Sequence, residues 1–136
     1  MKSSKRHGRC LCGGVIYKVD GELRQVLVCH CSQCRRSSGH QWAATAAPVE
    51  AVEFDCEKTL SWYRSSSRAK RGFCRRCGSS LFWQEDKSPL LSIAAGSLDV
   101  PTGLSTQEHI YFDDASDYYR VHPEEQIRTG SETVIE

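Results

Sequence analysis

Clustered cysteines constrain this chain more than any other feature of its sequence. Seven of the eight cysteines lie in three tight groups, and Cys56 alone stands apart from them. The central group, Cys29-His30-Cys31-Ser32-Gln33-Cys34, places three thiols in six residues. Shorter pairs lie on either side of it, Cys10-Leu11-Cys12 and Cys74-Arg75-Arg76-Cys77. Thiols at such spacings lie close enough to share one metal ion, so we expect metal sites.

The cellular compartment decides between metal ligands and disulfides. The chain begins with polar and basic residues 1–8 and shows no apolar segment of a secretory signal. No stretch approaches the roughly 20 apolar residues that span a membrane. We therefore expect a cytoplasmic protein without membrane association, in which thiols stay reduced. The alternative is a small secreted protein with four disulfides, which fits the even number of cysteines but not their clustering.

The two outer pairs can together form one closed metal site. The glycine after the second pair, Gly78, lets the backbone fold back so that amide N–H groups point at sulfur. Two such turns make a tetrahedral four-sulfur zinc site. We expect this site to be structural, because it ties residues far apart in sequence and metal binding offsets the entropy of closing that loop. Its expected ligands are Cys10, Cys12, Cys74 and Cys77.

The central group supplies only three thiolates, Cys29, Cys31 and Cys34. A zinc ion with three protein ligands keeps one position open for water or substrate, which is the usual catalytic arrangement. Three thiolates on a divalent cation carry a net charge of −1, and such a site suits a small thiol as its fourth ligand. We therefore expect the catalytic centre here.

Several alternatives to an open zinc site are consistent with the sequence. Cys56 would close the central group into a second four-sulfur site, and His30 would be a ligand if it pointed inward. The pairing of the cysteine groups is also open to rearrangement. An iron–sulfur cluster is a further alternative, although turns followed by glycine favour zinc.

Short runs that alternate apolar and polar residues predict a mainly β domain of small antiparallel sheets. The expected strands cover residues 15–19, 25–28, 51–55, 60–64, 80–84, 90–95 and 109–112, with one helical turn in 32–38. Residues 41–47 fit a strand or a helix by pattern, and we expect a strand because the run is short and its neighbours are strands. We expect a flexible basic arm at 1–9, one zinc-binding domain at 10–121 and a polar C-terminal tail at 122–136.

The cysteine groups and their flanks resemble the glutathione-dependent formaldehyde-activating enzyme (GFA) family, which includes centromere protein V. The resemblance runs from Cys10 to about Ala115. The matching pieces are Cys10-Leu11-Cys12-Gly13-Gly14-Val15, Cys29-His30-Cys31, Cys34-Arg35-Arg36, Gly39, Arg71, Phe73-Cys74, Cys77-Gly78-Ser79-Ser80-Leu81, Gly96-Ser97-Leu98-Asp99 and His109-Ile110.

The resemblance implies a β-tent fold of small antiparallel sheets held by a four-cysteine zinc site, and two zinc ions per chain. It implies that Cys10, Cys12, Cys74 and Cys77 hold the structural zinc and that Cys29, Cys31 and Cys34 hold the catalytic zinc. The implied activity is that of a carbon–sulfur lyase like S-hydroxymethylglutathione synthase, which joins formaldehyde to glutathione. The implied partners are thus a small thiol and an aldehyde.

Other residues suggest further roles. Arg35 and Arg36 follow the open site and would bind a substrate carboxylate, or else remain solvated. His40 is a candidate for proton transfer or a surface histidine. We expect Trp42, Trp62 and Trp83 to pack in or near the core, with at most one lining a pocket.

A second function, without catalysis, is a zinc-stabilised binding module. Residues 64–76 contain six basic side chains and no acid, which would contact nucleic acid or protein. The net charge of only +1 and the acidic C-terminal third disfavour nucleic acid. No pattern indicates an oligomeric state.

Overall fold

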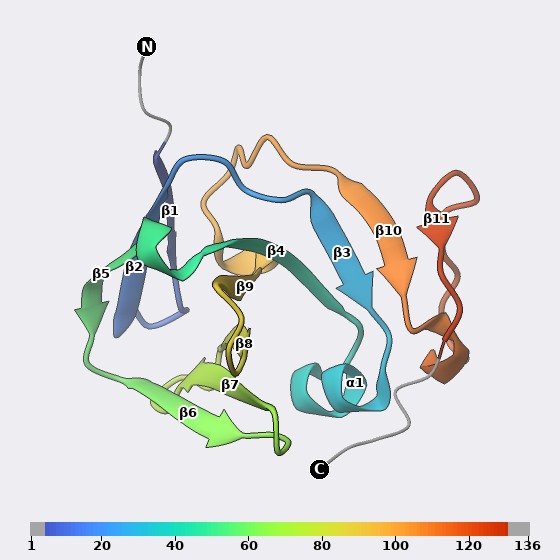
Figure 1. Ribbon diagram of the computed structural model, residues 1–136, viewed down its shortest axis with the longest axis horizontal. Helices are drawn as coiled ribbons and strands as arrows, with labels where there is room; N and C mark the ends of the chain where they lie inside the picture. Colours follow the sequence, from blue (N-terminus) through green and yellow to red (C-terminus); the bar gives the residue numbers. More distant parts are fainter. Residues whose placement is uncertain (1–4, 131–136) are drawn as a thin grey trace.

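The computed structural model describes residues 5–130. A three-stranded antiparallel sheet, in the order β1-β2-β5, forms one side of the molecule (Figure 1). Its strands are β1 (Lys5–Arg9), β2 (Val15–Asp20) and β5 (Val52–Glu57). Strand β2 buries alternate residues and exposes Asp20, so one face of this sheet packs on the core.

A larger sheet wraps around the rest of the molecule in the order β11-β10-β3-β4-β9-β8-β7-β6. Its strands are β3 (Val26–Cys29), β4 (Trp42–Pro48), β6 (Leu60–Arg64), β7 (Ala69–Cys74), β8 (Ser80–Glu85), β9 (Leu90–Ala94), β10 (Thr106–Ile110) and β11 (Gln126–Ile127). All neighbours are antiparallel except that β10 runs parallel to both β3 and β11. The mainly β fold that the sequence predicts is confirmed.

The helix α1 (Ser32–Ser38) follows β3 directly, and its position is fixed by its two ends. Cys31 caps the N-terminus, where its sulfur accepts a hydrogen bond from the Cys34 amide at 3.3 Å. Gly39 ends the helix in the left-handed conformation (φ 83°), which glycine adopts without steric cost. The short helix therefore holds the central cysteines in one compact turn.

The main core lies between the small sheet and strands β8 and β9 of the large sheet. Tyr17 from β2 packs edge-on against Phe82 from β8, with ring centroids 5.4 Å apart, and both are fully buried. Ile93 from β9 completes this contact region with no exposed surface. Three short 3₁₀ helices lie in connections between strands: Val49–Ala51, Ala95–Ser97 and Phe112–Asp114.

Most expected strand ends are shifted by one or two residues, and three expected features differ further from the structure. Lys5–Arg9, expected in a flexible arm, forms strand β1 and pairs with β2 over its whole length. Its sequence lacks the apolar alternation that would predict a strand. Strand β10 ends at Ile110, not at residue 112, because Tyr111 adopts a left-handed conformation (φ 55°). Gln126–Ile127, expected in the polar tail, forms β11 beside β10. Residues 1–4 and 131–136 of the expected arm and tail lie outside the described residues.

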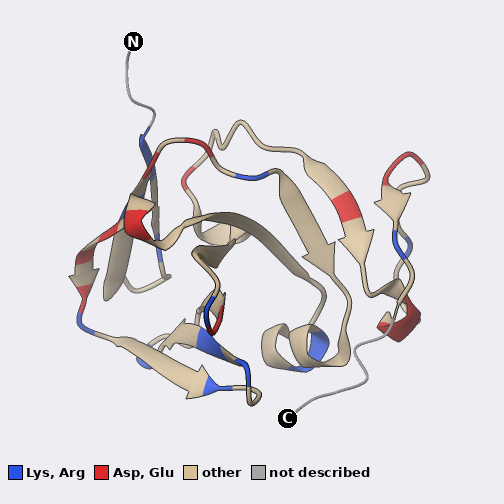
Figure 2. Cartoon of the chain, in the orientation of Figure 1, with Lys and Arg blue, Asp and Glu red and all other residues tan. Residues whose placement is uncertain are grey.

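Charge is unevenly distributed over this frame. Figure 2 shows Lys and Arg on the β6–β7 hairpin and on α1, with Asp and Glu on β5, on β10 and near the turn after β10. Among residues 5–130, no helix is long and apolar enough to cross a membrane.

Candidate metal centres and active-site cavity

The two outer cysteine pairs form matching turns. Cys10 and Cys12 lie between β1 and β2, while Cys74 and Cys77 lie between β7 and β8. The residue after each second cysteine is a glycine with φ +82°, Gly13 and Gly78. Backbone amides point back at the sulfurs, since Val15 N–H donates to Cys10 Sγ and Cys77 N–H donates to Cys74 Sγ, both at 3.3 Å.

The spacing of these sulfurs fits a tetrahedral metal site. Cys12 Sγ lies 3.7 Å from Cys10 Sγ and 3.6 Å from Cys74 Sγ, and all four sulfurs lie within 4.8 Å of one another. These separations far exceed a disulfide bond of about 2.05 Å. Zinc–sulfur bonds of about 2.3 Å arranged tetrahedrally place the sulfurs about 3.8 Å apart. The four residues that the sequence assigns to one site thus converge with the spacing that zinc requires.

Neighbouring side chains favour the thiolate form of this cluster. Ser79 Oγ lies 3.1 Å from Cys77 Sγ, and this hydrogen bond lowers the pKa of Cys77 to about 5. Arg76 Nε donates to Cys12 Sγ at 3.2 Å. Both contacts stabilise negative charge on sulfur, as a metal ligand needs.

The three central cysteines come together at the C-terminal end of β3. Cys29 ends that strand, Cys31 caps α1 and Cys34 lies in its first turn. The three sulfurs also lie within 4.8 Å of one another, and Cys31 and Cys34 are each only 5% exposed. The structure therefore gathers the four-cysteine cluster and the three-cysteine cluster that the sequence predicts as separate groups; their roles as zinc ligands remain predictions.

The three-cysteine cluster shares negative charge unequally. Hydrogen bonds from Cys29 and Cys34 hold the pKa of Cys31 well below its usual range. The same interaction, together with one from Cys34 and burial, raises the pKa of Cys29. A cation at this position would replace the shared protons, so the donor set suits a thiolate-binding metal such as zinc.

Two alternative fourth ligands lie elsewhere. Cys56 Sγ donates to the Gly14 carbonyl at 3.3 Å on strand β5, and it belongs to neither cysteine cluster. His30 is fully buried and uses both ring nitrogens for other contacts, with Tyr119 and His109. The structure therefore favours neither alternative for a fourth ligand, because both side chains make other contacts.

A cavity of about 300 Å³ opens onto the three-cysteine cluster and is called here the thiolate cavity. Such a volume is at the lower end of small-molecule sites, which span about 300–1,000 Å³. Two tryptophans line it, Trp42 from β4 and Trp83 from β8, while Trp62 is 38% exposed and lies outside its wall. The expectation that at most one tryptophan lines a pocket is therefore wrong.

Arginines other than the expected ones line the thiolate cavity. Arg24, Arg68 and Arg71 belong to its wall together with Glu85, whereas Arg35 and Arg36 do not. Arg71 is 7% exposed, and its Nη2 lies 3.6 Å from Cys34 Sγ. Of the two alternatives for Arg35 and Arg36, the structure does not favour substrate binding at this wall, whose arginines come from the β2–β3 connection and the β6–β7 hairpin.

A chain of hydrogen bonds begins beside the cysteines at His30 and joins residues that do not line the thiolate cavity. His30 Nδ1 lies 2.5 Å from the Tyr119 hydroxyl, and His30 Nε2 lies 2.8 Å from His109 Nδ1. His109 Nε2 in turn lies 2.7 Å from Glu125 Oε1. Burial, followed by the neighbouring His109 and His40, lowers the pKa of His30 to about 4, so its ring is neutral at pH 7. His40 is exposed and contacts the Tyr118 hydroxyl.

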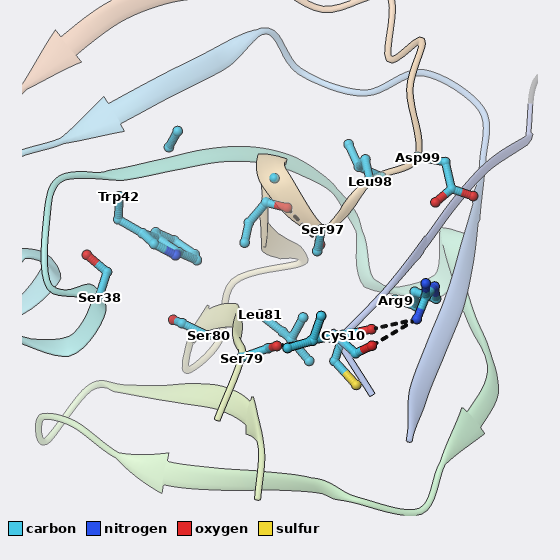
Figure 3. A pocket seen from close by; sticks show the side chains of 14 residues that line it. Arg9, Cys10, Ser38, Trp42, Ser79, Ser80, Leu81, Ser97, Leu98 and Asp99 are labelled. Atoms are coloured by element: carbon cyan, nitrogen blue, oxygen red, sulfur yellow. Dashed lines mark hydrogen bonds between the residues drawn. The ribbon is translucent and has the colours of Figure 1, made fainter. Parts of the chain in front are cut away.

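A second, more open cavity of about 600 Å³ lies on the other side of Trp42 (Figure 3). Small side chains from several elements form much of its wall, including Ser38, Ser80 and Ser97. Arg9 donates hydrogen bonds to the Cys10 and Leu11 carbonyls at its edge. Trp42 is part of the wall of both cavities, so its side chain borders each of them.

The sequence did not assign Arg71 to the thiolate cavity, nor His109 and Glu125 to the hydrogen bonds that begin at His30. Arg71 has a signal, since it belongs to the quoted motif, but it reads as one cation in a basic run. Glu125 has none, because the contact joins a polar tail to a buried histidine.

Comparison with known proteins identifies a family, a curated relative and a solved structure to which this chain is similar. Residues 5–114 match the sequence model of a family described as "Glutathione-dependent formaldehyde-activating enzyme". A protein of Schizosaccharomyces pombe named as an uncharacterized lyase is 32% identical over 76 residues. That match covers 56% of this chain and 55% of the yeast protein, so the chain spans about half the length of this curated relative. A crystal structure of a Rhodobacter sphaeroides protein is similar with a TM-score of 0.59 and 28% identity, covering 74% of this chain and 92% of that chain.

Proposed function

Because the chain belongs to the family of glutathione-dependent formaldehyde-activating enzymes, we propose that it is a carbon–sulfur lyase that forms or cleaves adducts between a small thiol and an aldehyde. One observation carries this proposal: three cysteine sulfurs converge at the wall of a cavity, while a separate four-sulfur cluster is complete without them. A structural module needs only the second cluster. The first, with three donors and adjacent space, is arranged for a ligand.

In this proposal the two clusters have different roles. Cys10, Cys12, Cys74 and Cys77 hold a structural zinc, and Cys29, Cys31 and Cys34 hold a catalytic one. The catalytic zinc, when bound, supplies a Lewis acid that favours the deprotonated form of a substrate thiol. The surrounding residues position that thiol and exclude water, since Trp42 and Trp83 give the cavity apolar walls.

The charges of the thiolate cavity suit a peptide-like thiol such as glutathione. Arg24 and Arg68 provide positive charge for carboxylates, and Glu85 provides a negative charge for an ammonium group. Arg24 is held by its own hydrogen bond to the Ala44 carbonyl at 3.0 Å, so its guanidinium has a defined position. Glutathione carries both kinds of group, and formaldehyde is small enough to reach the sulfur beside it.

The test is to load the purified chain with zinc, count the bound metal and follow adduct formation from glutathione and formaldehyde by NMR. We expect two zinc ions per chain and a rate above the uncatalysed reaction. Cys31→Ser should abolish that rate and lose one metal, while Cys56→Ser serves as the matched control and should keep both. Equal rates with wild-type protein, Cys31→Ser and no protein would overturn the proposal.

A further inference from the structure

Buried nitrogen atoms without hydrogen-bond partners identify a further feature of the thiolate cavity. Within residues 5–130, Nε and Nη1 of Arg71 are buried and have no partner, and neither has Nε1 of Trp42. Both residues line the thiolate cavity. A buried donor without a partner is energetically costly, and more so when the group is charged, so these N–H groups favour an acceptor that arrives with a ligand.

The Arg71 guanidinium is held in place by two neighbours. Its Nη2 donates to Gln33 Oε1 at 3.3 Å, and Gln33 Nε2 donates onward to the Ser65 carbonyl at 3.1 Å. The guanidinium carbon lies 5.9 Å from the Trp42 ring centroid. A donor held in this way needs little reorganisation when negative charge appears beside it, which is the property that makes electrostatic catalysis effective.

The distance to the cysteine cluster limits which acceptor Arg71 can meet. With Nη2 only 3.6 Å from Cys34 Sγ, the guanidinium lies beside the cysteine cluster at which the proposed function binds the substrate thiol. In an adduct of a thiol with an aldehyde, the former carbonyl oxygen is separated from the sulfur by one carbon. The carboxylates of a peptide thiol lie several bonds further away and fit the more exposed Arg68 at the same cavity.

We propose that Arg71 is a catalytic residue whose unpaired N–H groups bind the aldehyde oxygen as it becomes negatively charged; this inference rests on the proposed function. The thiolate electron pair forms the new C–S bond, and the C=O π pair moves onto oxygen. The oxygen then takes up one proton from solvent, equal to the proton that the thiol gave up. No oxidation or reduction occurs, and cleavage of the adduct is the same step reversed.

The kinetic test compares Arg71→Gln and Arg71→Lys with Arg36→Gln, which removes an exposed arginine outside the cavity. Arg71→Gln should lower kcat about 10²–10³-fold, as removal of one oxyanion donor does, with little change in the KM for glutathione. Arg71→Lys should recover part of the loss, and Arg36→Gln should behave as wild type. A rise in KM for glutathione alone would make Arg71 a carboxylate anchor and overturn the proposal, as would wild-type kinetics.

A binding test measures whether Arg71 binds an anionic oxygen, without catalytic turnover. Thioglycolate places a negative oxygen close to its sulfur, whereas 2-mercaptoethanol has a neutral hydroxyl. Added to the cobalt-substituted protein and followed by visible absorption, thioglycolate should bind about tenfold to hundredfold more tightly, as a charge-assisted hydrogen bond predicts. Arg71→Gln should lose this preference while keeping two metal ions, and Arg36→Gln should retain it.

The two tests separate this inference from the proposed function. If the wild-type chain forms no adduct with any thiol and aldehyde, the function fails and the thioglycolate preference still decides whether Arg71 binds the anionic oxygen. If Arg71→Gln loses the metal at the three-cysteine cluster while Arg71→Lys keeps both the metal and the full rate, Arg71 only balances thiolate charge and the proposal is wrong.

Discussion

At the scale of single residues, the series of hydrogen bonds that links Tyr119, His30, His109 and Glu125 has a fixed donor-to-acceptor direction. The Glu125 carboxylate only accepts, so His109 donates to it from Nε2, and the neutral form of His109 then accepts at Nδ1. His30 then donates from Nε2 and accepts at Nδ1 from the Tyr119 hydroxyl. One carboxylate thus sets the tautomer of two histidines, and His30 lies between two cysteines of the thiolate cavity.

Glu125→Gln should weaken this chain without removing any cysteine contact. An amide loses the charge of the acceptor, and hydrogen bonds to charged groups contribute about 1.5–3 kcal/mol, so we expect the free energy of unfolding to fall by about 1–2 kcal/mol. Urea denaturation of the zinc-loaded protein measures it. Glu124→Gln, an exposed neighbour, is the control. Equal stability of the two variants would show that the contact has no energetic weight.

The lowered pKa of His30 makes the free energy of unfolding decrease as the pH falls. In the unfolded chain this imidazole takes up a proton near pH 6.5, but in the folded protein only near pH 4. Between these values the unfolded state binds more protons, so the fold loses up to about 1.4 kcal/mol per pH unit as the pH falls. Unfolding at pH 7 and pH 5 should therefore differ less in His30→Gln than in wild type. Acid effects on the thiolates are common to both proteins, and an unchanged difference would contradict the prediction.

At this scale the sequence predicts the cysteines well and the arginines poorly. Tight spacing brings thiols together whatever the rest of the chain does, so Cys29, Cys31 and Cys34 could be grouped without a structure. Arg71 could not be distinguished from the exposed Arg68, because burial depends on how the β6–β7 hairpin packs against α1 and β4. The pairing of His109 with Glu125 likewise depends on β10 and β11 lying side by side.

At the scale of elements, the four-cysteine cluster joins two hairpin turns from different sheets. Cys10 and Cys12 belong to the β1–β2 connection, and Cys74 and Cys77 to the β7–β8 connection. The three-cysteine cluster instead joins only β3 to the helix that follows it. Loss of the four-cysteine cluster would therefore remove one link between the two sheets, whereas loss of the three-cysteine cluster would affect one local turn.

Cys77→Ser and Cys31→Ser should accordingly differ. Structural zinc sites contribute about 10–16 kcal/mol of apparent binding free energy in small domains, so Cys77→Ser should unfold the chain or lower its melting temperature strongly. Cys31→Ser should cost less than about 3 kcal/mol, as a typical substitution does, and release one metal. Circular dichroism melting with metal analysis measures both. Equal destabilisation would contradict the division between structural and catalytic sites.

Most strands were predictable because apolar alternation marks them, and Leu60–Arg64 has the predicted bounds. Strand β1 was not, because Lys5–Arg9 contains no apolar side chain and is held by backbone pairing with β2. Gly8 adds a constraint that no pattern reveals, since a Cβ there would collide with the Tyr17 ring and hydroxyl. Strand β11, only two residues long, carries too little sequence to predict.

At the scale of the whole molecule, the basic stretch 64–76 does not act as one surface. Arg64 pairs with Asp86 at 2.8 Å, Lys70 lies over the Trp62 ring at 4.5 Å, and Arg71 is buried. Arg76 contacts the four-cysteine cluster through Cys12. The side chains of a β hairpin point to alternate faces, so a run of cations in sequence becomes several separate sites.

This dispersion predicts weak binding to nucleic acid. With a net charge of +1 and few free cations on one face, the chain should show no measurable affinity for duplex DNA at physiological salt. Fluorescence anisotropy with a labelled duplex at two salt concentrations measures it. Tight binding that falls steeply with salt, and that Arg68→Gln weakens relative to Arg36→Gln, would instead favour the binding-module alternative.

The placement of the three tryptophans gives the molecule an internal optical signal. Trp42 and Trp83 line the thiolate cavity, and Trp42 also borders the larger cavity, while Trp62 lies outside on the β6–β7 hairpin. A ligand entering either space changes the surroundings of an indole without any added label. Because Trp42 borders both spaces and Trp83 only the thiolate cavity, a change in Trp83 emission would distinguish a ligand in the thiolate cavity from one in the larger cavity.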